Sequence, residues 1–132
     1  MDIFEKETLL KKIIRKMQDS VLVVEGKNDE KALREIGIES KIVKANGKTE
    51  KIIEKIKEGK SAKISLLFDF DEEGKRKTDF FREALHHEDV NADTELRKNV
   101  GMLFRIMTIE DLPRVYEELT EEIENQKRKR KT

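Results

Sequence analysis

Cysteine and tryptophan are both missing from this 132-residue chain, and proline occurs once. Without cysteine the protein has no disulfides and no thiolate metal sites. Long apolar runs are missing as well, because even the longest, such as Val21–Val24, are only four or five residues long. Such blocks are far too short for a membrane span or for the core of a signal peptide. We therefore expect a cytoplasmic protein with no membrane partner.

Neither sign of charge is in excess, because 29 basic residues balance 29 acidic ones. Charged residues make up 44% of the chain, well above the usual quarter. The balance argues against a uniformly basic nucleic-acid binder, and the spaced apolar blocks argue against a disordered chain. The abundance of lysine and glutamate is typical of the ion-pair networks of thermophilic proteins.

Two apolar spacings alternate along the chain and predict strands and helices in turn. Blocks rich in β-branched and apolar residues predict strands at residues 21–24, 41–45, 64–68 and 102–107. Helical spacing predicts helices at residues 2–17, 29–36 and 49–58, another through residues 80–85, a short one near 94–98, and a last one from residue 112. The alternation favours an α/β fold, compact and Rossmann-like, with a mostly parallel four-stranded sheet and helices on both faces. We expect an N-terminal helix (1–19) packed on one domain (20–126), followed by a basic tail (127–132).

Acidic residues stand where the predicted strands end. Glu25 follows the first strand, Asp29 opens the next helix, and Asp69 and Asp71 follow the third strand. Ligands of parallel sheets bind beyond the carboxyl ends of the strands, so these acids are expected to meet at one edge. An all-oxygen set favours Mg²⁺ or Mn²⁺. The alternative is that they are solvated loop acids.

Two segments resemble the motifs of the Toprim domain. Val21–Asp29 is similar to its first motif, a hydrophobic strand followed by Glu-Gly and a nearby Asp. Leu66–Gly74 is similar to its second motif, Asp-x-Asp-x-x-Gly, although Phe70 stands where the family often has a small residue or proline. The resemblance covers roughly residues 20 to 110. It implies a small stand-alone protein with a Toprim fold.

The resemblance also implies roles for individual residues. Glu25 would be the general acid or base, Asp69 and Asp71 would hold Mg²⁺ or Mn²⁺, and Asp29 and Glu73 would support the ion. Positions that would let phosphate approach are Gly26, Lys27, Lys48, Gly74 and Lys75. For Lys48 a plain surface position is the alternative, and for residues 75–77 a solvated helix face.

Three other patterns have simpler interpretations. Gly47-Lys48-Thr49 lacks the earlier glycine of a phosphate-binding loop, because Ile42 stands there. Tyr116, the single tyrosine, lies at an apolar position of the last helix and is interpreted as packing. The pair His86-His87 is interpreted as surface, since adjacent helix positions point in different directions.

The most one-sided segment is the basic run near the C-terminus. Its five residues are Lys127, Arg128, Lys129, Arg130 and Lys131. A run of like charges without apolar residues predicts disorder and often adds sequence-independent affinity for nucleic acid. A solubilising tail or a localisation signal has the same composition.

The function expected is Mg²⁺-dependent phosphodiester chemistry on nucleic acid, by a Toprim-type nuclease that processes RNA or DNA. The alternative is a non-catalytic nucleic-acid-binding or scaffold module within a larger processing complex. Primase-like nucleotidyl transfer is a weaker alternative. A phosphoacceptor receiver domain fits poorly, because Glu25-Gly26 and Met107-Thr108 lack the acid pair and the lysine that such domains place after their strands.

Overall fold

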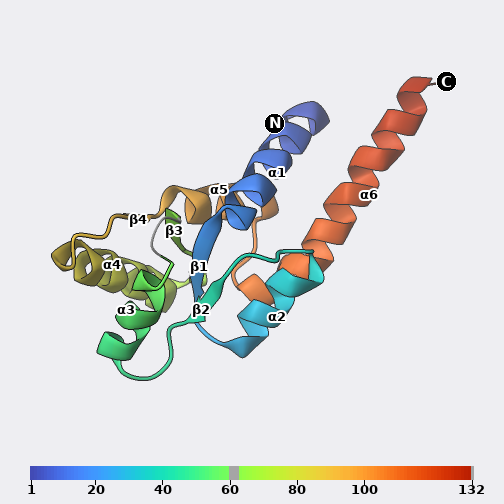
Figure 1. The fold of residues 1–132 in the computed structure, drawn as a ribbon. Helices are drawn as coiled ribbons and strands as arrows, with labels where there is room; N and C mark the ends of the chain where they lie inside the picture. Colours follow the sequence, from blue (N-terminus) through green and yellow to red (C-terminus); the bar gives the residue numbers. More distant parts are fainter. Residues whose placement is uncertain (60–62, 132) are drawn as a thin grey trace.

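A computed structural model describes residues 1–59 and 63–131 of the protein. Strands and helices alternate along most of the chain, as the apolar spacing predicts (Figure 1). In chain order the elements are α1 (Ile3–Gln18), β1 (Ser20–Val24), α2 (Lys27–Glu35), β2 (Ile42–Lys44), α3 (Thr49–Lys57), β3 (Lys63–Leu66), α4 (Glu72–His87), β4 (Ala92–Asp93), α5 (Glu95–Phe104), the 3-10 helix η1 (Ile109–Asp111) and α6 (Leu112–Lys131).

The four strands form one parallel sheet in the order β2-β1-β3-β4. Strand β1 lies inside the sheet, where Leu22 pairs with Ile42 on one side and with Ser65 on the other. All five residues of β1 are buried, which explains its unbroken apolar sequence. The predicted α/β fold class is confirmed.

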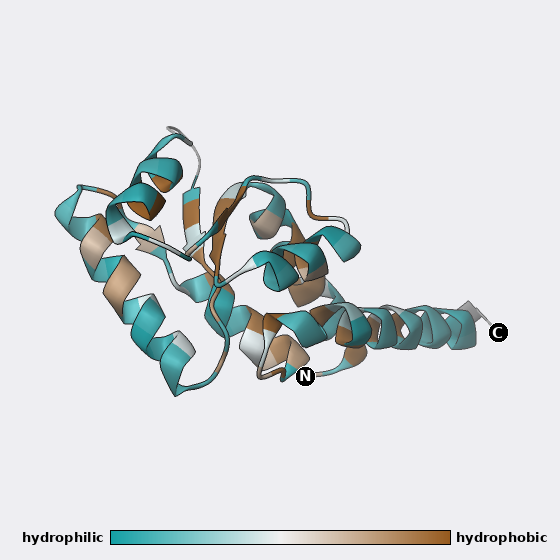
Figure 2. Cartoon of the chain, turned by 90° about the horizontal axis from the view of Figure 1, so that it is seen from below, coloured by the Kyte–Doolittle hydropathy of each residue, from teal (hydrophilic) through white to brown (hydrophobic). Residues whose placement is uncertain are grey.

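Helices cover both faces of the sheet (Figure 1). Successive residues of β1 point to opposite faces, so Leu22 and Val24 join one apolar cluster, and Val21 and Val23 join the other. Helices α1, α2, α5 and α6 pack on the first face, and α3 and α4 pack on the second. Figure 2 shows apolar residues concentrated on the strands and on the inward sides of the helices. None of the helices within the described residues combines the length and apolarity needed to span a membrane.

The strand predicted at residues 102–107 is wrong. Its first residues complete α5, whose buried side chains Leu96, Val100 and Phe104 recur every four residues on one face. Arg105 then ends the helix in the left-handed conformation, with φ of 52°. The fourth strand is instead β4, only two residues long and too short to leave a sequence pattern. The short helix expected near residues 94–98 is the beginning of α5.

The disorder predicted for residues 127–132 is also wrong for the described part, because α6 continues through Lys131. Contacts of Lys127 and Arg130 hold the end of α6 against α1. The Lys127 ammonium lies 2.5 Å from a Glu7 carboxylate oxygen. The guanidinium carbon of Arg130 lies 3.9 Å from the centroid of the Phe4 ring. Thr132 lies outside the described residues.

Candidate functional site at the carboxyl edge of the sheet

The strand order places a switch point between β1 and β3. From β1 the chain moves to β2 on one side, then crosses back to β3 on the other side. Ligands of open parallel sheets bind in the crevice beyond such a point, outside the carboxyl ends of the strands. Glu25 follows β1 there, and Asp69 comes shortly after β3, so both lie at this edge. The expectation that the strand-end acids share one edge is confirmed for this pair.

Asp29 lies in the first turn of α2 and is almost completely buried, at 7% exposed. Its Oδ2 accepts a hydrogen bond of 3.1 Å from the backbone N–H of Gly26. Burial raises the pKa of Asp29, and the negative charges of Asp69, Glu110 and Glu25 raise it further, while the Gly26 hydrogen bond lowers it. Asp29 is therefore a buried acid within the electrostatic reach of three others.

Asp69 is half-buried and held from two sides. Its Oδ1 accepts a hydrogen bond of 2.9 Å from the N–H of Ile109 in η1. Its carbonyl oxygen accepts one of 2.6 Å from Nη2 of Arg97 in α5. Burial is the main cause that raises the pKa of Asp69, and the charges of Glu25, Asp71 and Glu110 add to it. The carboxyl edge thus concentrates negative charge that a cation would stabilise.

Asp71 caps the N-terminus of α4, and its Oδ1 accepts a hydrogen bond of 2.7 Å from the N–H of Gly74. Gly74 is required by the turn itself, because a Cβ atom there would collide with the carbonyl oxygen of Asp69. Gly74 therefore lies against the protein's own backbone. The resemblance implied a different reason for this glycine, the approach of a phosphate. A Cβ atom on Gly26 would meet nothing within 4 Å, so space is open beside that glycine.

Lys77 of α4 links two of the predicted site residues. Its Nζ lies 2.6 Å from Oε1 of Glu25 and 3.5 Å from Oε1 of Glu73. The hydrogen bond to Glu25 is the main cause that raises the pKa of Lys77. Glu25 is therefore already paired with a cation supplied by the chain.

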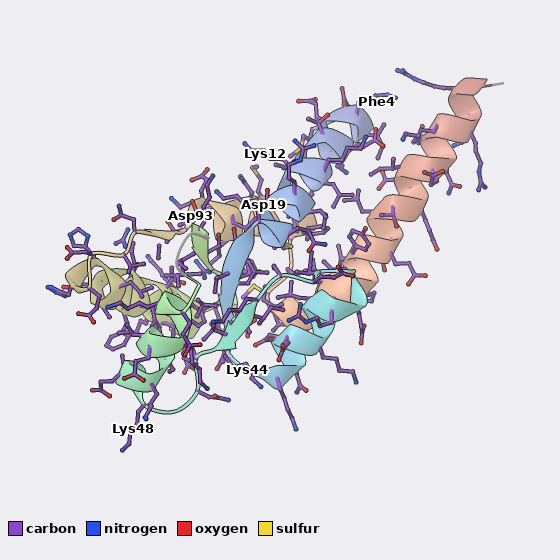
Figure 3. The ribbon with its side chains drawn as sticks, in the orientation of Figure 1. Phe4, Lys12, Asp19, Lys44, Lys48 and Asp93 are labelled. Atoms are coloured by element: carbon purple, nitrogen blue, oxygen red, sulfur yellow. The ribbon has the colours of Figure 1, made fainter. Side chains whose placement is uncertain are left out.

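The remaining predicted basic residues are spread over the surface. Lys27 and Lys75 are exposed at the starts of α2 and α4. Lys48 is exposed at the start of α3, and Figure 3 shows its side chain pointing away from the body of the protein. The basic end of α6 lies beside the N-terminal part of α1, at the opposite end of the molecule from the carboxyl edge (Figure 1). The structure does not bring this basic end together with the acids.

Tyr116 packs against the core and the two histidines lie on the surface, as the sequence predicted. Tyr116 is half-buried and packs against the core cluster of the first sheet face. His86 and His87 are both exposed near the end of α4.

Three parts of the site were not found from the sequence. Lys77 lies one helical turn after Glu73, a spacing that signals an ion pair, but nothing in the sequence points it at Glu25. Glu110 and the N–H of Ile109 reach the site because η1 folds back over the end of β3. Arg97 comes from α5, which the sequence only partly predicted.

In the part of the chain that the structure describes, no group of three or more acidic or histidine side chains is close enough to hold a metal ion by itself. Asp69 and Asp71 each use one carboxylate oxygen for a backbone N–H. Mg²⁺ commonly binds one or two carboxylates and completes its shell with water and substrate phosphate. The carboxylates at this edge fit an ion held in that way and do not form an all-protein cage.

Comparison with solved structures found a similar protein from Aquifex aeolicus. The two chains are 30% identical and superpose with a TM-score of 0.67. The match covers 80% of this chain and 95% of the A. aeolicus chain. That protein is described without an activity. No family model matches this chain, and neither does any curated protein.

Proposed function

The chain belongs to the same family as the A. aeolicus protein, and we propose that it is a cytoplasmic Mg²⁺-dependent enzyme of the Toprim type that cleaves phosphodiester bonds in RNA or DNA. The observation that carries the proposal is the meeting of Glu25, Asp29 and Asp69 beyond the switch point of the sheet. Burial and neighbouring negative charges raise the pKa of both Asp29 and Asp69, and such perturbed acids in a crevice are typical of functional sites.

The carboxylates of Asp69 and Asp71 would hold Mg²⁺ or Mn²⁺, with Asp29 and Glu73 in support. When bound, the ion supplies charge stabilisation at the phosphate oxygens. Asp69 is fixed for this role by the N–H of Ile109 on its side chain. Asp71 is fixed by the N–H of Gly74 at the start of α4. Both acids therefore have a set orientation before any ligand arrives.

Glu25 is the residue that we propose moves the proton. It follows β1 directly, and Lys77 holds its Oε1 at 2.6 Å. In this proposal the carboxylate takes a proton from the attacking oxygen or returns one to the leaving oxygen. Open space beside Gly26 gives a phosphate room to approach, and Lys27 stands next to that space.

The test is a cleavage assay on labelled structured RNA, single-stranded RNA and DNA, with Mg²⁺, Mn²⁺ or a chelator. We expect metal-dependent cleavage that Glu25→Gln reduces by about 10²- to 10⁴-fold, the usual contribution of a general acid or base. Asp71→Asn should lose activity in a way that added Mn²⁺ partly restores. Glu121→Gln, an exposed change on α6, is the matched control and should cleave normally.

A second candidate function is supported by the ion pair between Glu25 and Lys77. An acid already neutralised by a lysine suits a non-catalytic module that binds nucleic acid or serves as a scaffold in a larger processing complex. If the wild-type protein and both site variants bind these substrates alike and none cleaves, this second function replaces the first.

A further inference from the structure

A pocket of about 510 Å³ lies between α4 and α5. Asp71 forms part of its wall, so the pocket opens directly beside the candidate site. Its volume falls within the range of pockets that bind small organic groups, about 300 to 1,000 Å³. The proposed cleavage mechanism assigns no function to this pocket.

One side of the pocket carries a fixed aromatic ring, that of Phe70. The guanidinium carbon of Arg97 lies 5.1 Å from the ring centroid. Gly101, one turn further along α5, lets the ring come close, because a Cβ atom there would lie 3.0 Å from Cε1 of Phe70. Arg97 is itself anchored by its hydrogen bonds to the carbonyl oxygens of Phe68 and Asp69. The ring is therefore held on α5 by neighbours that are themselves fixed.

The pocket also carries cations. Its basic residues are Lys75, Arg82, Arg97 and Lys98, and its acidic residues are Asp71, Glu72 and Asp79. Asp71 accepts the N–H of Gly74, and Asp79 lies 3.9 Å from Arg82, so two of these acids already have partners. Among the described residues, Lys75 and Lys98 form no ion pair. These two ammonium groups are available to an anionic ligand.

We propose that this pocket binds one unstacked nucleotide of a single-stranded nucleic acid, next to the phosphodiester at the candidate site. The base packs on Phe70, and Lys75 and Lys98 meet the phosphate charge. Aromatic rings beside a cationic groove are the usual means of holding single strands. The inference rests on the proposed function for the class of ligand, and it gives a role to the pocket side of Phe70, a residue that also packs against the core.

The test measures binding of single-stranded RNA and DNA that carry the fluorescent base 2-aminopurine, in the presence of a chelator so that no cleavage occurs. Stacking quenches this base. Phe70→Leu keeps apolar bulk against the core but removes the aromatic face. We expect it to abolish the quenching and to weaken binding roughly 5- to 100-fold, the range for loss of one base stack. Phe70→Tyr keeps the aromatic face and should retain both the quenching and the affinity. A side chain that only filled space at this position would not produce this difference between leucine and tyrosine.

The lysines are tested by salt dependence. Lys75→Ala and Lys98→Ala should each lower the slope of log affinity against log salt by about 0.7, the value for one phosphate contact to a single strand. Lys51→Ala, an exposed lysine on α3 that removes the same charge, is the matched control and should leave the slope unchanged.

The outcomes separate this inference from the proposed function. If the wild-type protein cleaves while Phe70→Leu and Lys98→Ala bind normally, the pocket assignment is overturned and the enzyme stands. If the pocket variants weaken binding while the wild-type protein cleaves nothing, the pocket stands and the enzyme fails. The assignment is also overturned if duplexes bind as tightly as single strands, or if no oligonucleotide binds.

Discussion

The ammonium of Lys77 lies 2.6 Å from the carboxylate of Glu25, so helix α4 supplies the counter-charge for the acid that follows β1. The same ammonium lies 3.5 Å from Glu73. One lysine thus offsets part of the negative charge at the carboxyl edge. This contact makes Lys77 a competitor of any divalent cation that binds there.

Replacing Lys77 should therefore strengthen metal binding. Lys77→Met removes one positive charge from the acidic edge, and we expect Mn²⁺ to bind about 1.4- to 5-fold more tightly, matching the roughly 0.2–1 kcal/mol of a partly exposed ion pair. Calorimetric titration with Mn²⁺ measures the change. Lys51→Met, the control on α3, should leave the affinity as it is. Equal or weaker affinity in Lys77→Met would contradict the competition.

The pKa of Asp29 predicts a pH-dependent gain in stability on its replacement. Because the pKa is raised in the folded protein, the folded state binds more protons than the unfolded state just above the ordinary pKa of aspartate. The free energy of unfolding therefore falls as pH rises through this window, above about pH 4. An asparagine at this position cannot ionise, yet its amide oxygen can still accept the Gly26 N–H. Asp29→Asn should raise the melting temperature at pH 7 more than at pH 4, as thermal unfolding would show, and an equal shift at both values would contradict the prediction.

Gly74 should tolerate no side chain. Gly74→Ala drives a Cβ atom into the carbonyl oxygen of Asp69, so the turn between β3 and α4 must move. We expect a loss of about 1–3 kcal/mol or more in the free energy of unfolding, the usual cost of forcing atoms into a packed region. Gly26→Ala is the control, because its new Cβ atom would meet nothing within 4 Å. Denaturant unfolding of the two variants should differ clearly; similar losses would refute this interpretation of the turn.

The basic end of α6 should contribute to nucleic-acid binding through its charge. Deleting residues 127–131 is expected to weaken binding and to flatten its salt dependence. The change in slope should be smaller than five free cations would give, because Lys127 pairs with Glu7 and Arg130 packs on Phe4. Affinity measured from about 50 to 200 mM salt tests this. An unchanged slope would exclude the segment from the binding surface.

The sequence predicts the fold wherever a buried element leaves a long apolar pattern. The run Val21–Val24 identifies β1 as a central parallel strand, and the structure confirms it. The apolar residues after Gly101 also resemble a strand, but they belong to a helix whose buried face is visible only when Leu96 and Val100 are included. Strand β4 cannot be predicted, because its two residues take their form from pairing with β3.

The candidate site is predictable to the extent that it depends on strand ends. Glu25 and Asp69 follow adjacent parallel strands, so their common edge follows from the order of elements. The partners that fix or neutralise them depend on long-range packing. Lys77 reaches Glu25 across 52 residues of chain, and Ile109 reaches Asp69 across 40. No local pattern encodes such distances.

The lengths of the outer strands bear on how the protein behaves at high concentration. Strands β2 and β4 form the two margins of the sheet, with three and two residues. An exposed margin can pair with another molecule, and short strands flanked by charge discourage this. Lys41 precedes β2 and Lys44 is its last residue, and both are exposed. The sheet thus offers a second molecule little backbone to extend it, which favours a dispersed protein over strand-to-strand aggregates.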